Sequence, residues 1–88
     1  MGELGRLKMH YERDGNVVEV YNAPKVCSLV INGKIVDEYR GLVGWKFVLR
    51  GAIEQDGEFI PVLAEMKYVS MKLYYAHKCV GKKFMGLG

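Results

Sequence analysis

The sequence lacks threonine and has only two serines, two cysteines and two histidines among its 88 residues. Ser28 and Ser70 lie in apolar, strand-like runs, with no His or Asp at the spacing of a known hydrolase motif. A nucleophilic serine needs a base within hydrogen-bond reach, which this pattern does not provide. A phosphate-binding loop, in turn, continues from its glycines into Lys-Ser/Thr and a helix. The segment 41–44, Gly-Leu-Val-Gly, has no such continuation. We therefore predict no catalytic residue, no cofactor and no enzymatic activity.

The two cysteines are too few for a disulfide-stapled secreted domain. Cys27 lies in an apolar run and is expected to be a small buried hydrophobe, whereas a Cys27–Cys79 disulfide would need the two Cα atoms within about 7 Å. His77 and Cys79 have the spacing of two zinc ligands, but His10 and Cys27 are the only other His or Cys candidates. We predict reduced thiols and no metal site.

Long apolar runs are also missing, because no segment approaches the roughly 18 residues that span a bilayer. The first residues contain no apolar core of a secretory signal. Together with the sparse cysteines, this favours a cytoplasmic protein without a membrane segment. The length predicts one domain, residues 1–88, and the hydrophobic content of 50% is ordinary for a folded protein.

An internal repeat organises the chain, since the block 12–28 recurs without gaps at 54–70. The identical pairs include Glu12 with Glu54, Asp14 with Asp56, Gly15 with Gly57, Val20 with Val62, Lys25 with Lys67, and Ser28 with Ser70. Such self-similarity predicts two copies of one structural unit, residues 1–42 and 43–88. The alternative is chance similarity between two amphipathic strand pairs.

Asp-Gly or Asn-Gly pairs separate the strand-like runs at 14–15, 32–33 and 56–57. Both central residues of a two-residue hairpin turn need positive φ, which these residues tolerate. The corresponding place in the second repeat, 76–81, has no such pair, so we expect a looser turn there and a short last strand at 82–85. Gly51 lies inside a predicted strand, where glycine marks a bulge or a close backbone approach.

The segment 68–75 alternates cleanly, with Val69, Met71, Leu73 and Tyr75 on one side. This period of two predicts a strand. A helix over 64–78 is the alternative, because Ala, Glu, Met, Lys and Leu favour helix. The repeat favours the strand, since this segment aligns with one that contains Pro24 and the turn at 32–33.

These elements add up to eight short strands in two four-stranded meanders. Two antiparallel sheets, each with one apolar face, bury those faces against each other. We therefore predict an all-β fold, a small antiparallel β-sandwich built from two four-stranded meander repeats.

The order of these signals resembles a known family. Asp14-Gly15, Val18-x-Val20, the run 25–34 (Lys-Val-x-x-x-Val-x-Asn-Gly-Lys), Leu-Val-Gly at 42–44 and Phe47-x-Leu49 together resemble the β-sandwich domain of the Fas apoptotic inhibitory molecule family. The resemblance covers most of the chain and implies a non-enzymatic sandwich without assigning any site. The segment 75–83 departs from the compact turn expected in the second repeat.

Positive charge is concentrated late in the chain, where residues 66–88 contain five lysines and no acid. Aromatic rings on an open sheet can stack on bases while lysines contact phosphates. The candidate binding face consists of Tyr68, Lys72, Tyr74, Lys82 and Lys83. The alternative is an ordinary sheet face on which lysine stems cover apolar surface.

Several predicted strands are apolar on both faces, which leaves more apolar surface than one small domain can bury. Contiguous apolar patches usually mark an interaction site. We therefore expect a binding or assembly module that forms a homodimer, with a different protein partner or an apolar ligand as rival explanations for the patch. A nucleic-acid-binding or anion-binding domain that uses the lysine-rich C-terminal quarter is the alternative function.

Overall fold

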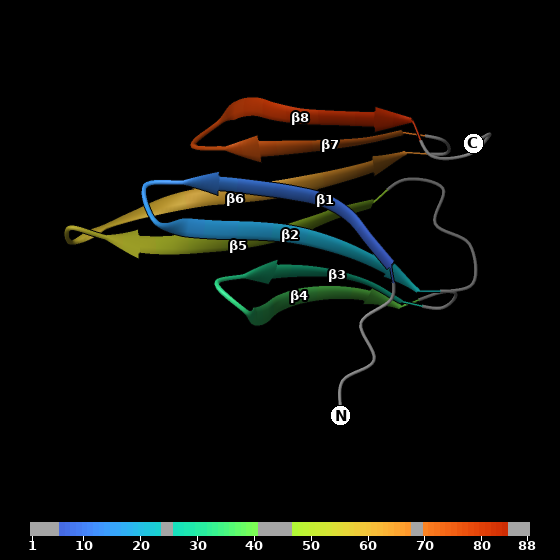
Figure 1. Ribbon diagram of the computed structural model, residues 1–88, viewed down its shortest axis with the longest axis horizontal. Helices are drawn as coiled ribbons and strands as arrows, with labels where there is room; N and C mark the ends of the chain where they lie inside the picture. The colour runs from blue at the N-terminus through green and yellow to red at the C-terminus, as the bar shows by residue number, and fades with distance from the viewer. Residues whose placement is uncertain (1–5, 24–25, 41–46, 68–69, 85–88) are drawn as a thin grey trace.

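A computed structural model describes residues 6–23, 26–40, 47–67 and 70–84, which form eight strands in two antiparallel sheets (Figure 1). The first sheet contains β1 (Arg6–Arg13), β2 (Asn16–Ala23), β3 (Val26–Ile31) and β4 (Lys34–Arg40), and the second contains β5 (Phe47–Gln55), β6 (Glu58–Lys67), β7 (Ser70–Tyr75) and β8 (Lys78–Phe84). Strands follow sequence order in both sheets. The all-β fold with two four-stranded meanders is confirmed, and the alternative helix over 64–78 is wrong. Within the described ranges, no helix is long and apolar enough to cross a membrane.

Tight turns close the hairpins at one end of the molecule, on the left in Figure 1. The expected turns at 14–15, 32–33 and 56–57 all have positive φ at both residues, as the sequence predicts. The fourth turn differs from the prediction. Ala76 and His77 have φ of 53° and 70°, and Tyr75 pairs directly with Lys78. The looser turn expected at 76–81 is therefore wrong, and the last strand begins at Lys78 rather than at 82.

The structural repeat keeps one offset through the first hairpin of each sheet, and the offset then changes. Gln55 pairs with Glu58 just as Arg13 pairs with Asn16, an offset of 42 positions. The turn after β7 then follows the turn after β3 by 44 positions, because β6 has 10 residues and β2 has 8. Leu29 consequently occupies the place of Leu73 rather than that of Met71.

Inward-facing side chains of both sheets meet in one core. Its fully buried members include Val18, Val20 and Leu29 from the first sheet, and Leu49, Val62, Met71 and Leu73 from the second. Burying each such side chain contributes roughly 1.5–3 kcal/mol to stability. The alternation predicted for 68–75 is confirmed for Met71, Leu73 and Tyr75, which are buried between the partly exposed Ser70, Lys72 and Tyr74. Val69 lies outside the described residues.

Gly51 lies at a close approach between the two sheets. A Cβ atom at this position would lie 2.7 Å from Val36 Cγ2 and 3.0 Å from Ile31 Cδ1. The register between β5 and β6 is continuous at Gly51. Of the two roles that the sequence allows, this glycine therefore serves a close approach rather than a bulge.

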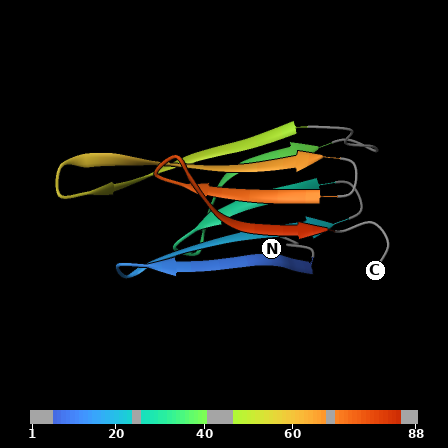
Figure 2. The same cartoon turned by 90° about the horizontal axis from the view of Figure 1, so that it is seen from above.

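The outer strands of the two sheets meet on opposite sides of the molecule. Figure 2 shows β4 beside β5 at the top and β1 near β8 at the bottom. On the first side, the rings of Tyr39 and Phe47 stack with centroids 4.0 Å apart. On the second side, the rings of Tyr11 and Tyr75 approach to 5.4 Å. These contacts join the sheets without continuous strand pairing between them.

Candidate functional site

The sequence-predicted binding face is brought together in part. Lys72 and Tyr74 point outward from β7, and Lys82 lies directly opposite Lys72 on β8. Lys83 pairs through its backbone with Met71, but its side chain lies outside the described part of the chain. Tyr68 also lies outside the described residues. Three of the five predicted residues thus belong to the outer face of the second sheet.

Strand pairing adds neighbours that the sequence analysis did not include. Register places Glu65 beside Lys72, and Leu63 beside Tyr74. Arg50 of β5 pairs in turn with Leu63 of β6, and its side chain is exposed. Sequence periodicity identifies outward residues on each strand, but only the register shows which of them become neighbours.

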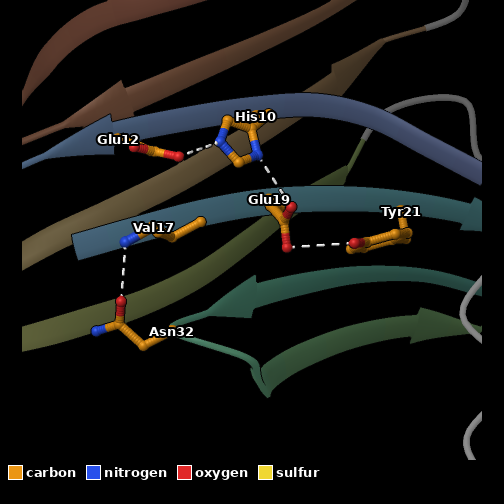
Figure 3. Close-up of polar contacts among 6 residues, drawn as sticks. All are labelled: His10, Glu12, Val17, Glu19, Tyr21 and Asn32. Carbon is orange, nitrogen blue, oxygen red and sulfur yellow. Dashed lines mark hydrogen bonds and ion pairs between the residues drawn. The ribbon is translucent and has the colours of Figure 1, made fainter. Parts of the chain in front are cut away.

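A second polar cluster lies on the outer face of the first sheet, where two carboxylates flank His10 (Figure 3). Nε2 lies 2.8 Å from Glu12 Oε2, and Nδ1 lies 2.9 Å from Glu19 Oε2. Two carboxylate oxygens act as acceptors, so both ring nitrogens donate when the imidazole is protonated. Hydrogen bonds to Glu12 and to Glu19 accordingly raise the pKa of His10 above its usual value of 6.5. This arrangement favours the imidazolium over a free general base.

Glu19 also accepts a hydrogen bond from the Tyr21 hydroxyl at 3.2 Å (Figure 3). Burial, followed by this bond to Glu19, raises the pKa of the Tyr21 hydroxyl above 10.0. Nearby, the Asn32 side-chain oxygen accepts from the Val17 N–H at 2.8 Å and fixes the turn after β3. The cluster therefore strengthens pairing around β2, which is a structural role.

Two cysteine thiols and the Ser28 hydroxyl are further reactive groups among the described residues. Burial raises the pKa of the Cys27 thiol to about 11, so this thiol stays protonated and unreactive near neutral pH. Ser28 is buried beside it. Cys79 is exposed, and its thiol donates to the Gly81 carbonyl at 3.5 Å. Both thiols are free, and among the described residues no three His, Cys, Asp or Glu side chains are placed to hold a metal ion.

Four exposed apolar side chains belong to β4 and β5, which lie side by side. We call this set the assembly edge; its members are Ile35, Val36 and Tyr39 of β4 and Val48 of β5, each between 36% and 40% exposed. Of the apolar runs on which the dimer expectation was based, 26–31 is largely buried, whereas 59–64 contains the exposed Phe59 and only two buried residues. Trp45, which also supported that expectation, lies outside the described residues. The sequence signal for the assembly edge was the Ile35-Val36 pair in a strand that is otherwise polar.

The Asp37 side chain accepts hydrogen bonds from two backbone N–H groups at this edge. Its Oδ1 accepts from the Glu38 N–H at 2.9 Å, and its Oδ2 accepts from the Arg50 N–H of β5 at 2.8 Å. One carboxylate thus satisfies a backbone donor on the outer strand of each sheet. Charged side chains that occupy a strand edge in this way oppose pairing with a further strand.

Comparisons of the chain with protein-family models, with curated proteins and with solved structures find no match.

Proposed function

We propose that the chain is a non-enzymatic binding and assembly module that pairs with a second copy of itself through the assembly edge. The observation that carries the proposal is the concentration of Ile35, Val36, Tyr39 and Val48 on two adjacent outer strands. Aromatic and aliphatic side chains grouped in this way are typical of interface cores.

A second copy suits this surface because the charges of β4 are self-complementary. Antiparallel alignment of the two β4 strands about a two-fold axis at Val36, without backbone hydrogen bonds between them, would bring Lys34 of each copy near Glu38 of the other. An isologous contact repeats each such interaction twice, so a modest patch is covered on both molecules. Asp37 already accepts from the Glu38 and Arg50 amides, so the contact relies on side chains rather than on added backbone pairing.

The absence of an enzymatic role is part of the proposal. Its support is the chemistry of the nucleophiles: Cys27 is protonated and buried, and His10 is held between two carboxylates. Two free thiols, one of them exposed at Cys79, support a reducing setting such as the cytoplasm.

Sedimentation equilibrium from micromolar to hundreds of micromolar protein tests the self-association. We expect a mass that rises with concentration from 10.0 kDa toward twice that value. The double variant Ile35→Lys/Val48→Lys should remain monomeric, because a lysine on each strand makes burial of the patch unfavourable.

The matched control is Phe59→Lys. Phe59 is 72% exposed, more than any member of the assembly edge, but it lies near the turn between β5 and β6. We expect this variant to associate like the natural chain. A natural chain that stays monomeric throughout, or a Phe59→Lys variant that dissociates as completely as the double variant, would contradict the proposal.

A further inference from the structure

The outer face of the second sheet contains a pair of like charges that folding does not explain. Lys72 on β7 lies directly opposite Lys82 on β8. Like charges in this cross-strand position destabilise a sheet. Lys82 is exposed and Lys72 is partly exposed, so both can contact a ligand.

The ion pairs of the molecule do not neutralise this pair. Among the described residues, the ion pairs within 4.0 Å all join side chains of the first sheet and its β1–β2 turn, such as Arg40 with Glu38 and Arg13 with Asp14. Glu65 is the register neighbour of Lys72 but forms no such pair with it. Among the described residues, the ion pairs thus lie on the first sheet, whereas Lys72 and Lys82 of the second sheet form none.

Further cations extend this surface. Alternation along β5 and β6 places Arg50 and Lys67 on the same outer face as Lys72 and Lys82, and both are exposed. The acids that alternation places there are Glu54 and Glu65. Cations therefore outnumber acids on this face, which gives it charge complementarity to an anion.

Tyr74 supplies an aromatic surface among these cations. It lies two residues from Lys72 on the same side of β7, and its cross-strand neighbours are Leu63 and Cys79. The ring is partly exposed, with apolar Leu63 on one side. A ring beside lysines on an open sheet is an arrangement that stacks a base while its flanking phosphates meet the cations.

We propose that the outer face of the second sheet binds single-stranded nucleic acid, with Tyr74 stacking on a base and Lys72, Lys82 and Arg50 contacting phosphates. A single strand fits better than a duplex because its bases are free to reach a ring on a sheet, while duplex bases are stacked inside the helix. Three phosphate contacts imply weak binding whose logarithmic salt dependence has a slope of about −2.

Fluorescence anisotropy of labelled oligodeoxythymidine and oligouridine, measured at several salt concentrations, tests this inference. We expect binding in the micromolar range at low salt. Lys72→Glu and Lys82→Glu should each weaken it about tenfold by losing a phosphate contact and adding repulsion. Lys78→Glu is the matched control, because it makes the same change of charge at an exposed residue of β8 that pairs with the inward-facing Tyr75.

The stacking contribution is tested separately at Tyr74. Tyr74→Phe should retain binding and Tyr74→Leu should weaken it several-fold, since leucine keeps the apolar contact but has no ring to stack. Circular dichroism and thermal unfolding establish that each variant is folded before binding is measured.

Several results would overturn the inference. They are the absence of binding at low salt, equal weakening by Lys78→Glu, and retained affinity in Tyr74→Leu. Tighter binding of duplex DNA or of phosphatidylserine vesicles than of the single strand would reassign the face to another anionic partner. Self-association is measured without nucleic acid and depends on other residues, so failure of one proposal leaves the other intact.

Discussion

Tyr75 is only 3% exposed, and its buried hydroxyl group has no hydrogen-bond partner among the described residues. An unsatisfied buried hydroxyl costs about 1–3 kcal/mol. Tyr75→Phe keeps the ring against Tyr11 and beneath the Arg13 guanidinium, 5.6 Å from the ring centroid. We therefore expect this variant to be more stable by up to about 1 kcal/mol in urea unfolding.

The matched control for that experiment is Tyr11→Phe. The Tyr11 side chain is partly exposed rather than buried, so removing its hydroxyl should bring no gain in stability. A lower free energy of unfolding for Tyr75→Phe would mean that its hydroxyl has a partner.

His10 gives a prediction about pH. Because Glu12 and then Glu19 raise its pKa in the folded state, the imidazolium stabilises the fold fully below 6.5, its unfolded value. That stabilisation is lost as pH rises through the higher folded pKa. The stability difference between the natural chain and His10→Gln should therefore shrink from mildly acidic to alkaline pH.

An NMR titration of the His10 ring measures the shift directly. We expect a midpoint above 6.5 in the natural chain and a lower midpoint in Glu12→Gln, because that carboxylate makes the largest contribution. An unchanged midpoint in Glu12→Gln would show that this hydrogen bond is not formed.

At the scale of the element, the turn between β7 and β8 stands out because Ala76 and His77 both adopt the left-handed conformation. This conformation costs a residue with a side chain roughly 1 kcal/mol or more, whereas glycine adopts it freely. The double variant Ala76→Asn/His77→Gly reproduces the turn at 32–33. We expect thermal unfolding to shift upward by roughly 4–8 °C, the change that 1 kcal/mol produces in a domain of this size.

The reverse exchange is the control, since Asn32→Ala/Gly33→His should lower stability. It also removes the Asn32 side chain that accepts from the Val17 N–H. A destabilised Ala76→Asn/His77→Gly variant would contradict the assignment of left-handed geometry at this turn.

This turn also shows how far the elements could be predicted from the sequence. Three hairpins followed from Asp-Gly and Asn-Gly pairs, because those residues favour the turn by themselves. Ala76-His77 has no such preference, and strand pairing on either side imposes its conformation. The two additional residues of β6 were equally undetectable, since a shift of two preserves the alternation of inward and outward side chains.

The candidate sites likewise contain residues that the sequence predicts and contacts that it does not. Alternation placed Lys72 and Tyr74 on one face because their separation is local. The hydrogen bond from the Arg50 N–H to the Asp37 carboxylate joins the two sheets. Such a contact depends on how the sheets pack rather than on any spacing along the chain.

At the scale of the whole molecule, the fit between the sheets depends on Gly51. A methyl group there would lie 2.7 Å from Val36 Cγ2, so Gly51→Ala should cost about 1–3 kcal/mol in the free energy of unfolding. Val36 is β-branched and has little freedom to move aside. The double variant Gly51→Ala/Val36→Ala should recover part of the loss, and urea unfolding of the four proteins measures this coupling. Strictly additive effects would show that the two positions are not in contact.

The division of the chain into two successive sheets has a consequence for biosynthesis. A ribosome completes β1 to β4 before any strand of the second sheet has emerged. At about 5–20 residues per second, the strands that cover Val18, Val20 and Leu29 follow only after several seconds. During that interval the nascent chain is half a molecule with an uncovered apolar face. The order of translation, rather than the final packing, thus determines when this chain is most exposed to chaperones and to neighbouring nascent chains.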